Sequence, residues 1–171
     1  MKKRFYFLLL WCSLTISAQS VQVATEDATI DFTFLDGNVD GTLSEFQFTG
    51  SINLSQLTSS VFSGTVATKT LDTDNWLRSR HLRGKKFFNA SEYPQLRFNG
   101  KTTRVDNGVI IVQGALTIKG ILRDVVFRFK QTQNTFIGKT AINTQDYDIS
   151  VYDKRDRNVV DIKITIPYRV Q

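Results

Sequence analysis

Apolar residues alternate with polar ones along several stretches of the chain, which is typical of β-strands with one apolar face. In the clearest stretch, from Val160 to Tyr168, every second residue is apolar, and Asp161, Lys163 and Thr165 lie between them. The other alternating sets are Ile30, Phe32 and Phe34; Phe46 and Phe48; Leu96 and Phe98; Val109 and Ile111; and Val125, Phe127 and Phe129. The pattern predicts a chain built mainly of half-buried strands.

Turn signals separate these strands, including Asp40-Gly41, Asp106-Asn107-Gly108 and Lys119-Gly120. Short strands with close turns favour an antiparallel sandwich or barrel. The 13 phenylalanines favour a barrel with an aromatic-lined cavity over a sandwich packed with smaller side chains. The alternative, in which these rings simply fill a core, stays open on composition alone.

One segment, from Thr68 to Phe98, interrupts the strands with helix-like, cationic sequence. Asp74 is a candidate N-cap for a helix over residues 75–83, and Gly84 is placed to end it. Trp76, Leu77, His81 and Leu82 approximate one apolar face. We expect the helix to close one end of the barrel with Trp76, Leu82 and Phe87 or Phe88. The alternative reading of its cations is a solvated surface.

The first nineteen residues have the features of a secretory signal peptide: a basic start, an apolar run from Phe5 to Leu14, and small residues at Ser17-Ala18. A lipoprotein signal would need a small residue before Cys12, where Trp11 stands. Removal of residues 1–19 would leave one cysteine-free domain, residues 20–171, and lower the formal net charge from +6 to +3. We therefore expect a periplasmic or secreted protein, and this charge is weak evidence for nucleic-acid binding.

No pattern of catalytic residues stands out. His81 is the one histidine, and a zinc site usually needs three or four ligands, so no metal is expected. Ser79 and Asp72 lie near His81 in sequence, but there is no Gly-x-Ser-x-Gly elbow around a nucleophile. Neither Gly-x-Gly-x-x-Gly nor a Walker motif is present, and the pairs of aspartates lie among basic residues. We expect a protein that is not an enzyme and has no cofactor.

Three segments in the same order resemble the YceI-like family of exported lipid-binding proteins: "LDTDNWLRSRHLRGKKFFNASEYPQLRF", "VQGALTIKGILRDVVF" and "AINTQDYDI". The resemblance implies an extended, lipocalin-like, eight-stranded antiparallel barrel with a hydrophobic tunnel for a long polyisoprenoid chain. This sequence departs from the family pattern over residues 143–148, where members tend to have an Arg before the Asp and a Gly after the aromatic residue.

Alternation and resemblance together give a set of expected tunnel-lining residues for an isoprenoid, an isoprenoid quinone or a related lipid. They are Phe32, Phe34, Phe46, Phe48, Trp76, Leu82, Phe87, Phe88, Phe98, Ile111, Phe127, Phe129 and Ile164. The candidates for contact with a lipid head group or an anionic membrane are Arg78, Arg80, His81, Arg83 and Lys86. The alternative function is an exported interaction module that binds another protein or an anionic envelope polymer and carries no lipid.

Overall fold

The computed structural model describes residues 21–170, so the predicted signal peptide lies outside the described residues. Ten strands, one α-helix and five 3₁₀ turns make up this part of the chain. The strands are β1 (Val21–Val23), β2 (Thr29–Phe34), β3 (Val39–Leu43), β4 (Gln47–Phe48), β5 (Ser63–Ala67), β6 (Gln95–Asp106), β7 (Val109–Ile118), β8 (Ile121–Thr132), β9 (Thr135–Asn143) and β10 (Val159–Val170). The helices are η1 (Thr25–Asp27), η2 (Leu57–Ser59), η3 (Thr68–Thr70), α1 (Trp76–Arg83), η4 (Thr144–Tyr147) and η5 (Arg155–Asn158).

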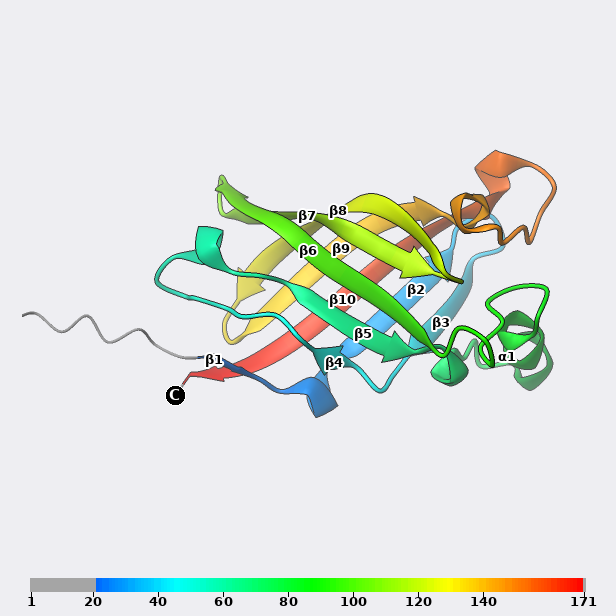
Figure 1. Ribbon diagram of the computed structural model, residues 1–171, viewed down its shortest axis with the longest axis horizontal. Coiled ribbons are helices and arrows are strands. Elements are labelled where there is room, and N and C mark those ends of the chain that lie inside the picture. Colours follow the sequence, from blue (N-terminus) through cyan, green and yellow to red (C-terminus); the bar gives the residue numbers. More distant parts are fainter. Residues whose placement is uncertain (1–20, 171) are drawn as a thin grey trace, which may run out of the picture.

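All strands belong to one antiparallel sheet in the order β3-β2-β10-β9-β8-β7-β6-β5-β4, with β1 paired to β10. The sheet curls along its length, and α1 lies at one end (Figure 1). The all-β, barrel-like expectation is confirmed. The number of strands is ten and not eight, because the short segments β1 and β4 also pair with the sheet.

The curl follows from how the chain joins the two edges of the sheet. β3 and β4 lie at opposite ends of the strand order, yet only residues 44–46 separate them in sequence. A connection of this length spans at most about 14 Å. The two edges of the sheet, β3 and β4, must therefore approach each other. Thr42 and Asp72 exchange backbone hydrogen bonds of 2.8 and 3.0 Å, and the Ala67 N–H donates to the Ser44 carbonyl at 3.3 Å. The segment after β5 thereby bridges the edge of β3.

β10 shows how the sequence pattern sets the inner face. Ile162 pairs with Phe32 and Ile164 with Ile30, and all four side chains pack into the interior. Pro167, which has no N–H to donate, falls between the part of β10 that pairs with β2 and the part that pairs with β1.

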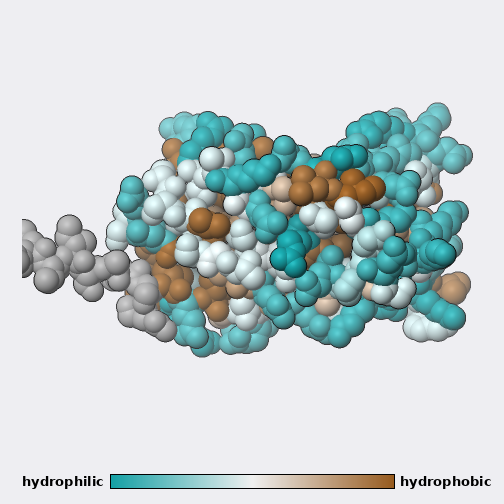
Figure 2. Space-filling model, viewed as in Figure 1, coloured by the Kyte–Doolittle hydropathy of each residue, from teal (hydrophilic) through white to brown (hydrophobic). Residues whose placement is uncertain are grey.

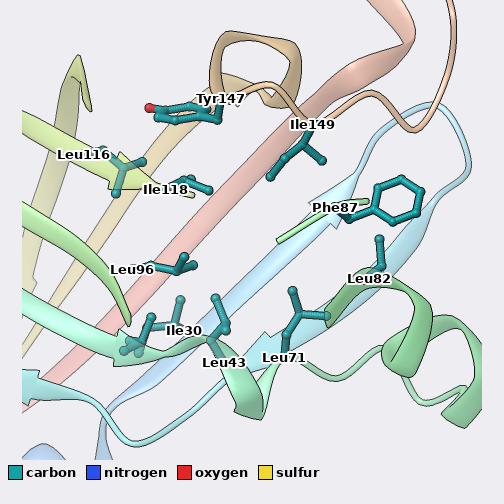
Figure 3. Packing of buried hydrophobic residues seen from close by; sticks show 11 residues of the cluster. Ile30, Leu43, Leu71, Leu82, Phe87, Leu96, Leu116, Ile118, Tyr147 and Ile149 are labelled. Atoms are coloured by element: carbon teal, nitrogen blue, oxygen red, sulfur yellow. The ribbon is translucent and has the colours of Figure 1, made fainter. Parts of the chain in front are cut away.

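The interior contains two hydrophobic clusters, one toward each end of the curled sheet. The cluster beside α1 includes Leu71, Leu82, Phe87, Tyr147 and Ile149 (Figure 3). At the opposite end, aromatic rings pack on one another: the centroids of Phe62 and Phe129 are 4.8 Å apart, and those of Phe136 and Tyr168 are 4.9 Å apart. The outer surface on the face in Figure 2 is mostly hydrophilic, with separate apolar patches.

Candidate ligand-binding cavity

A cavity of about 120 Å³ runs inside the curled sheet and contacts both hydrophobic clusters. Leu82, Phe88 and Ile149 line it toward α1, whereas Phe62 and Ile166 line it toward the aromatic end. Its wall is therefore almost continuously apolar along the sheet. Such a space fits an elongated apolar ligand better than a compact polar one.

Ten of the thirteen predicted lining residues lie on this cavity. They come from strands on all sides of the curled sheet and from the segment around α1. The ten are Phe32, Phe34, Phe46, Phe48, Leu82, Phe88, Phe98, Phe127, Phe129 and Ile164. Whether these residues bind a ligand stays a prediction.

Trp76 does not line the cavity: 68% of its surface is exposed. The prediction that Asp74 is the N-cap of this helix is wrong. Asn75 is the N-cap: its side chain accepts from the Arg78 N–H at 3.0 Å, and helix α1 begins at Trp76. The buried helix positions are Ser79 and Leu82, so the face that contains them packs on the barrel. Trp76 lies about a quarter turn away from that face and points to solvent.

A partly buried hydrogen-bond cluster, in which Ser79 and Thr73 are buried and Asp72 is exposed, sets this orientation of α1. The Ser79 hydroxyl donates to the Asp72 carboxylate at 2.8 Å, and it accepts from the Thr73 N–H at 2.9 Å. Hydrogen bonding to Ser79 and to the Thr73 N–H holds the pKa of the Asp72 carboxyl below its usual value. Sequence reasoning assigned the packed face to apolar residues and so missed that a serine fixes it.

Phe87 and Ile111 also lie outside the cavity lining. Phe87 is buried in the cluster beside α1, where its ring is nearly perpendicular to that of His81, with the two centroids 5.0 Å apart. Its neighbour Phe88 lines the cavity instead. On β7, Ile110 and Val112 belong to the interior cluster, so Ile111 lies on the opposite face of the sheet. Four consecutive apolar residues, 109–112, carry no alternation from which the inner face could be read.

The structure adds lining residues that were not predicted. Several follow the strand alternation and were accessible to sequence reasoning: Ile30, Leu96, Val160, Ile162 and Ile166. Thr144, Tyr147 and Ile149 lie in and after the 3₁₀ turn η4, where no hydrophobic period signals burial. Asp148, which stands where the family tends to have Gly, adopts the left-handed conformation (φ 55°, ψ 40°), so the turn is kept without glycine.

The candidate head-group cations divide into two groups. Arg78 donates to the Thr73 hydroxyl and carbonyl at 2.9 and 2.6 Å, and Arg83 donates to the Lys69 and Leu71 carbonyls at 3.2 Å each. These two arginines thus stabilise the connection between β5 and α1. Arg80 lies over the exposed Trp76 ring at 5.4 Å, and Lys86 lies over the Phe87 ring at 5.5 Å.

The polar residues considered for catalysis take part in loop and cap contacts. Ser79 is 1% exposed and bonded to Asp72, whereas Asp146 pairs with Arg155 at 2.8 Å and Asp148 with Lys119 at 3.0 Å. Residues 21–170 contain no group of three or more His, Cys, Asp and Glu side chains placed to hold a metal ion. The same residues contain no helix long and apolar enough to cross a membrane.

Comparison with known sequences gives a family. The model of the YceI-like domain matches residues 17–171. Protein YceI of Escherichia coli is 28% identical over 104 residues, covering 59% of this chain and 54% of that relative, so this match spans about half of the relative's length. A UPF0312 protein of Shewanella oneidensis is 25% identical over 173 residues, covering 88% of this chain and 90% of that protein.

Solved structures share the fold at low sequence identity. BcnA of Burkholderia cenocepacia is 20% identical, with a TM-score of 0.78 over 85% of this chain and 98% of that one. The YCEI protein of Campylobacter jejuni is 19% identical, with a TM-score of 0.66 over 78% of this chain and 85% of that one. A polyisoprenoid-binding domain of Saccharophagus degradans is 11% identical, with a TM-score of 0.60 over 90% of this chain and 99% of that one.

Proposed function

Because the chain belongs to the YceI-like family, we propose that it is a non-catalytic binding protein that holds a long apolar lipid chain in its cavity. The observation that carries the proposal is the apolar wall, which extends from Leu82 beside α1 to Ile166 near the aromatic end. A structural neighbour is described as a polyisoprenoid-binding domain, which supports an isoprenoid chain or an isoprenoid quinone as the ligand. The leader-like sequence of residues 1–19 supports action outside the cytoplasm.

Burial of the chain supplies the affinity in this proposal. Apolar surface contributes about 25 cal/mol per Å², so about 330 Å² of buried ligand surface matches the roughly 8.2 kcal/mol of a micromolar complex. The free-energy cost of association raises the buried area that is needed for this affinity. A chain of several isoprene units has a larger apolar surface than about 330 Å². Binding of this kind requires no reactive group.

We place lipid transfer at the α1 end, where the helix presents Trp76 and Leu77 to solvent, 68% and 66% exposed. Arg80, Lys85 and Lys86 are exposed on the same segment. Tryptophan favours the interface between water and lipid, and basic residues favour an anionic membrane surface. Because Leu82 on the inner face of α1 lines the cavity, docking this helix on a membrane brings the lipid source close to the site.

Lipid extraction from the purified protein, followed by mass spectrometry, tests the function. We expect an apolar chain lipid in the native protein and less of it in Phe48→Trp, because the larger ring occupies the cavity. Leu122→Trp is the matched control, since Leu122 is 54% exposed and the added bulk stays outside. Protein that carries no lipid and takes none up from lipid extracts would overturn the proposal. So would equal lipid content in folded Phe48→Trp and Leu122→Trp.

A further inference from the structure

Two buried hydroxyl groups, on residues that line the cavity, have no hydrogen-bond partner in the described part of the chain. They are the Thr144 Oγ1 and the Tyr147 OH, on residues that are 3% and 1% exposed. Buried polar groups are nearly always bonded, because leaving one unbonded costs its desolvation free energy. Both residues line the cavity, so a bound molecule could satisfy them.

The two hydroxyls lie on one side of η4. This segment is a 3₁₀ turn with three residues per turn, so Thr144 and Tyr147, three positions apart, share a face. That face looks inward, and Tyr147 belongs to the same buried cluster as Leu116 and Ile118 (Figure 3).

The remaining polar residues on the lining face outward. Gly64 pairs with Phe98 and Val66 with Leu96, and these residues point inward, so Ser63, Thr65 and Arg97 lie on the outer face of β5 and β6. Two side-chain contacts agree with this. The Ser63 hydroxyl accepts from the Gly100 N–H at 3.0 Å, and the Arg97 guanidinium donates to Gln95 at 3.3 Å. Among the described lining residues, the inward polar groups are therefore the two hydroxyls of η4. The nearby cation is Arg123, which pairs with the inward-facing Leu116 and acts electrostatically on Tyr147. Its side chain is exposed and donates to the Leu122 carbonyl at 3.1 Å.

External contacts hold η4 in place. The Asn143 side chain accepts from the Gln145 N–H at 3.1 Å and donates to the Arg155 carbonyl at 2.6 Å. Lys119 donates to the Asp148 carbonyl at 2.7 Å, just after the turn. Burial, with a smaller contribution from the nearby Asp146 and against an opposing effect of Arg123, raises the pKa of Tyr147 to about 12, so its phenol stays protonated at neutral pH. The cavity thus presents two neutral hydroxyls, each able to donate and to accept.

We propose that Thr144 and Tyr147 form a polar subsite for an uncharged, oxygen-bearing head group, a hydroxyl or a carbonyl, on the lipid that the cavity holds. The inference rests on the proposed function and deepens it by naming the head-group chemistry. A carbonyl or hydroxyl oxygen satisfies the orphaned hydroxyls and needs no counter-charge. A phosphate placed there would carry negative charge into an apolar space, while Arg123, the cation that acts on Tyr147, stays exposed to solvent, so burying the phosphate is unfavourable.

The test compares three probes that share one chain: geranylgeraniol, the hydrocarbon in which hydrogen replaces its hydroxyl, and geranylgeranyl diphosphate. Affinities come from displacement of an apolar fluorescent dye from the purified protein. We expect the alcohol to bind more tightly than the other two. Tyr147→Phe and Thr144→Val should each weaken alcohol binding by about threefold to tenfold while leaving hydrocarbon binding unchanged.

Tyr168→Phe is the matched control, because this buried tyrosine lies outside the cavity lining and its hydroxyl already donates to the Gln133 carbonyl at 3.2 Å. It should leave the preference for the alcohol intact. Hydrocarbon and alcohol binding that respond equally to Tyr147→Phe and Thr144→Val would overturn the subsite, while the lipid-binding function would stand. Tighter binding of the diphosphate would overturn it too. Failure of all three probes to bind would overturn the proposed function itself, and the subsite with it.

Discussion

Trp76 and Leu82 lie on the same short helix but differ in burial, with exposed fractions of 68% and 9%. Trp76→Ala should therefore change the free energy of unfolding by only about 0.5 kcal/mol, as is usual for surface positions. Leu82→Ala removes packing from the cluster beside α1 and should cost about 2–5 kcal/mol. Urea unfolding of both variants measures the contrast. A loss above about 2 kcal/mol in Trp76→Ala would show that the indole is packed after all.

Gly138 provides space for an aromatic ring in the core. It pairs with Phe129 across β8 and β9, and a Cβ at position 138 would overlap the ring carbons of Phe129. Phe129 is 2% exposed and stacks on Phe62, so it has little room to move. Gly138→Ala should destabilise the fold by about 1–3 kcal/mol through overpacking.

The neighbouring exposed residue Lys139 supplies the control for this glycine. Lys139→Ala should be nearly neutral in the same urea titration. If the two alanine variants were equally stable, the ring would be free to shift and the glycine would have no packing role.

Sequence alone predicted the inner face wherever apolar and polar residues alternate strictly, as in β10 and around Phe127 and Phe129. It failed at Ile111, because an unbroken apolar run has no periodicity to mark the inner side. It also failed at Trp76, since the packed face of α1 depends on hydrogen bonds of Ser79 with Asp72 and Thr73, which are formed only in the folded chain. The polar subsite was missed because a 3₁₀ turn is too short to show a pattern.

At the scale of elements, Asn158 stabilises the loop between η4 and β10. It is fully buried: its Oδ1 accepts from the Val151 and Tyr152 N–H groups at 2.9 and 3.1 Å, and its Nδ2 donates to the Tyr152 and Lys154 carbonyls at 2.8 and 2.7 Å. Asn158→Ala breaks all four bonds and should cost about 2–5 kcal/mol. Lys154→Ala, at an exposed position whose carbonyl is unchanged, is the control. Equal urea midpoints would contradict this role.

Docking of α1 should depend on pH through Asp72. Because its hydrogen bonds with Ser79 and Thr73 lower its pKa in the folded state below the ordinary value of 3.8, the ionised carboxylate stabilises the fold. This contribution is complete above the ordinary pKa and disappears as the pH falls through the lower, folded-state pKa. Asp72→Asn keeps an oxygen acceptor but does not titrate.

The stability gap between the native protein and Asp72→Asn should therefore be constant near neutral pH and narrow in acid. Urea unfolding at a series of pH values measures it. A stability gap that does not change with pH would mean that Asp72 has the same pKa in the folded and unfolded chains.

At the scale of the whole molecule, the barrel and its cavity were expected from alternation together with family resemblance. Neither the alternation nor the resemblance predicted which segments bring the two edges of the sheet together. That closure depends on the three-residue link between β3 and β4 and on the pairing of Thr42 with Asp72, two residues far apart in sequence. Contacts of this range are set by the complete fold and leave no local signal.

The membrane-docking proposal predicts salt-dependent binding to vesicles. Arg80, Lys85 and Lys86 are exposed near Trp76, whereas Arg83 is engaged with backbone carbonyls and is left unchanged. Each basic group near an anionic surface contributes about 1 kcal/mol, so replacing all three by Gln should weaken binding to phosphatidylglycerol vesicles by about a hundredfold at low salt. At physiological salt the Debye length is about 8 Å, and the difference should shrink.

The control removes the same charge from the outer face of the sheet, at Arg128, Lys130 and Lys139, all exposed on β8 and β9. If docking occurs through α1, this triple variant should bind vesicles much more tightly than the α1 triple variant, and both should keep their lipid content. Equal loss in the two variants would mean that net charge alone attracts the protein to the surface. If the native protein does not bind anionic vesicles even at low salt, the cations beside α1 serve as a solvated surface, and lipid must reach the cavity by another route.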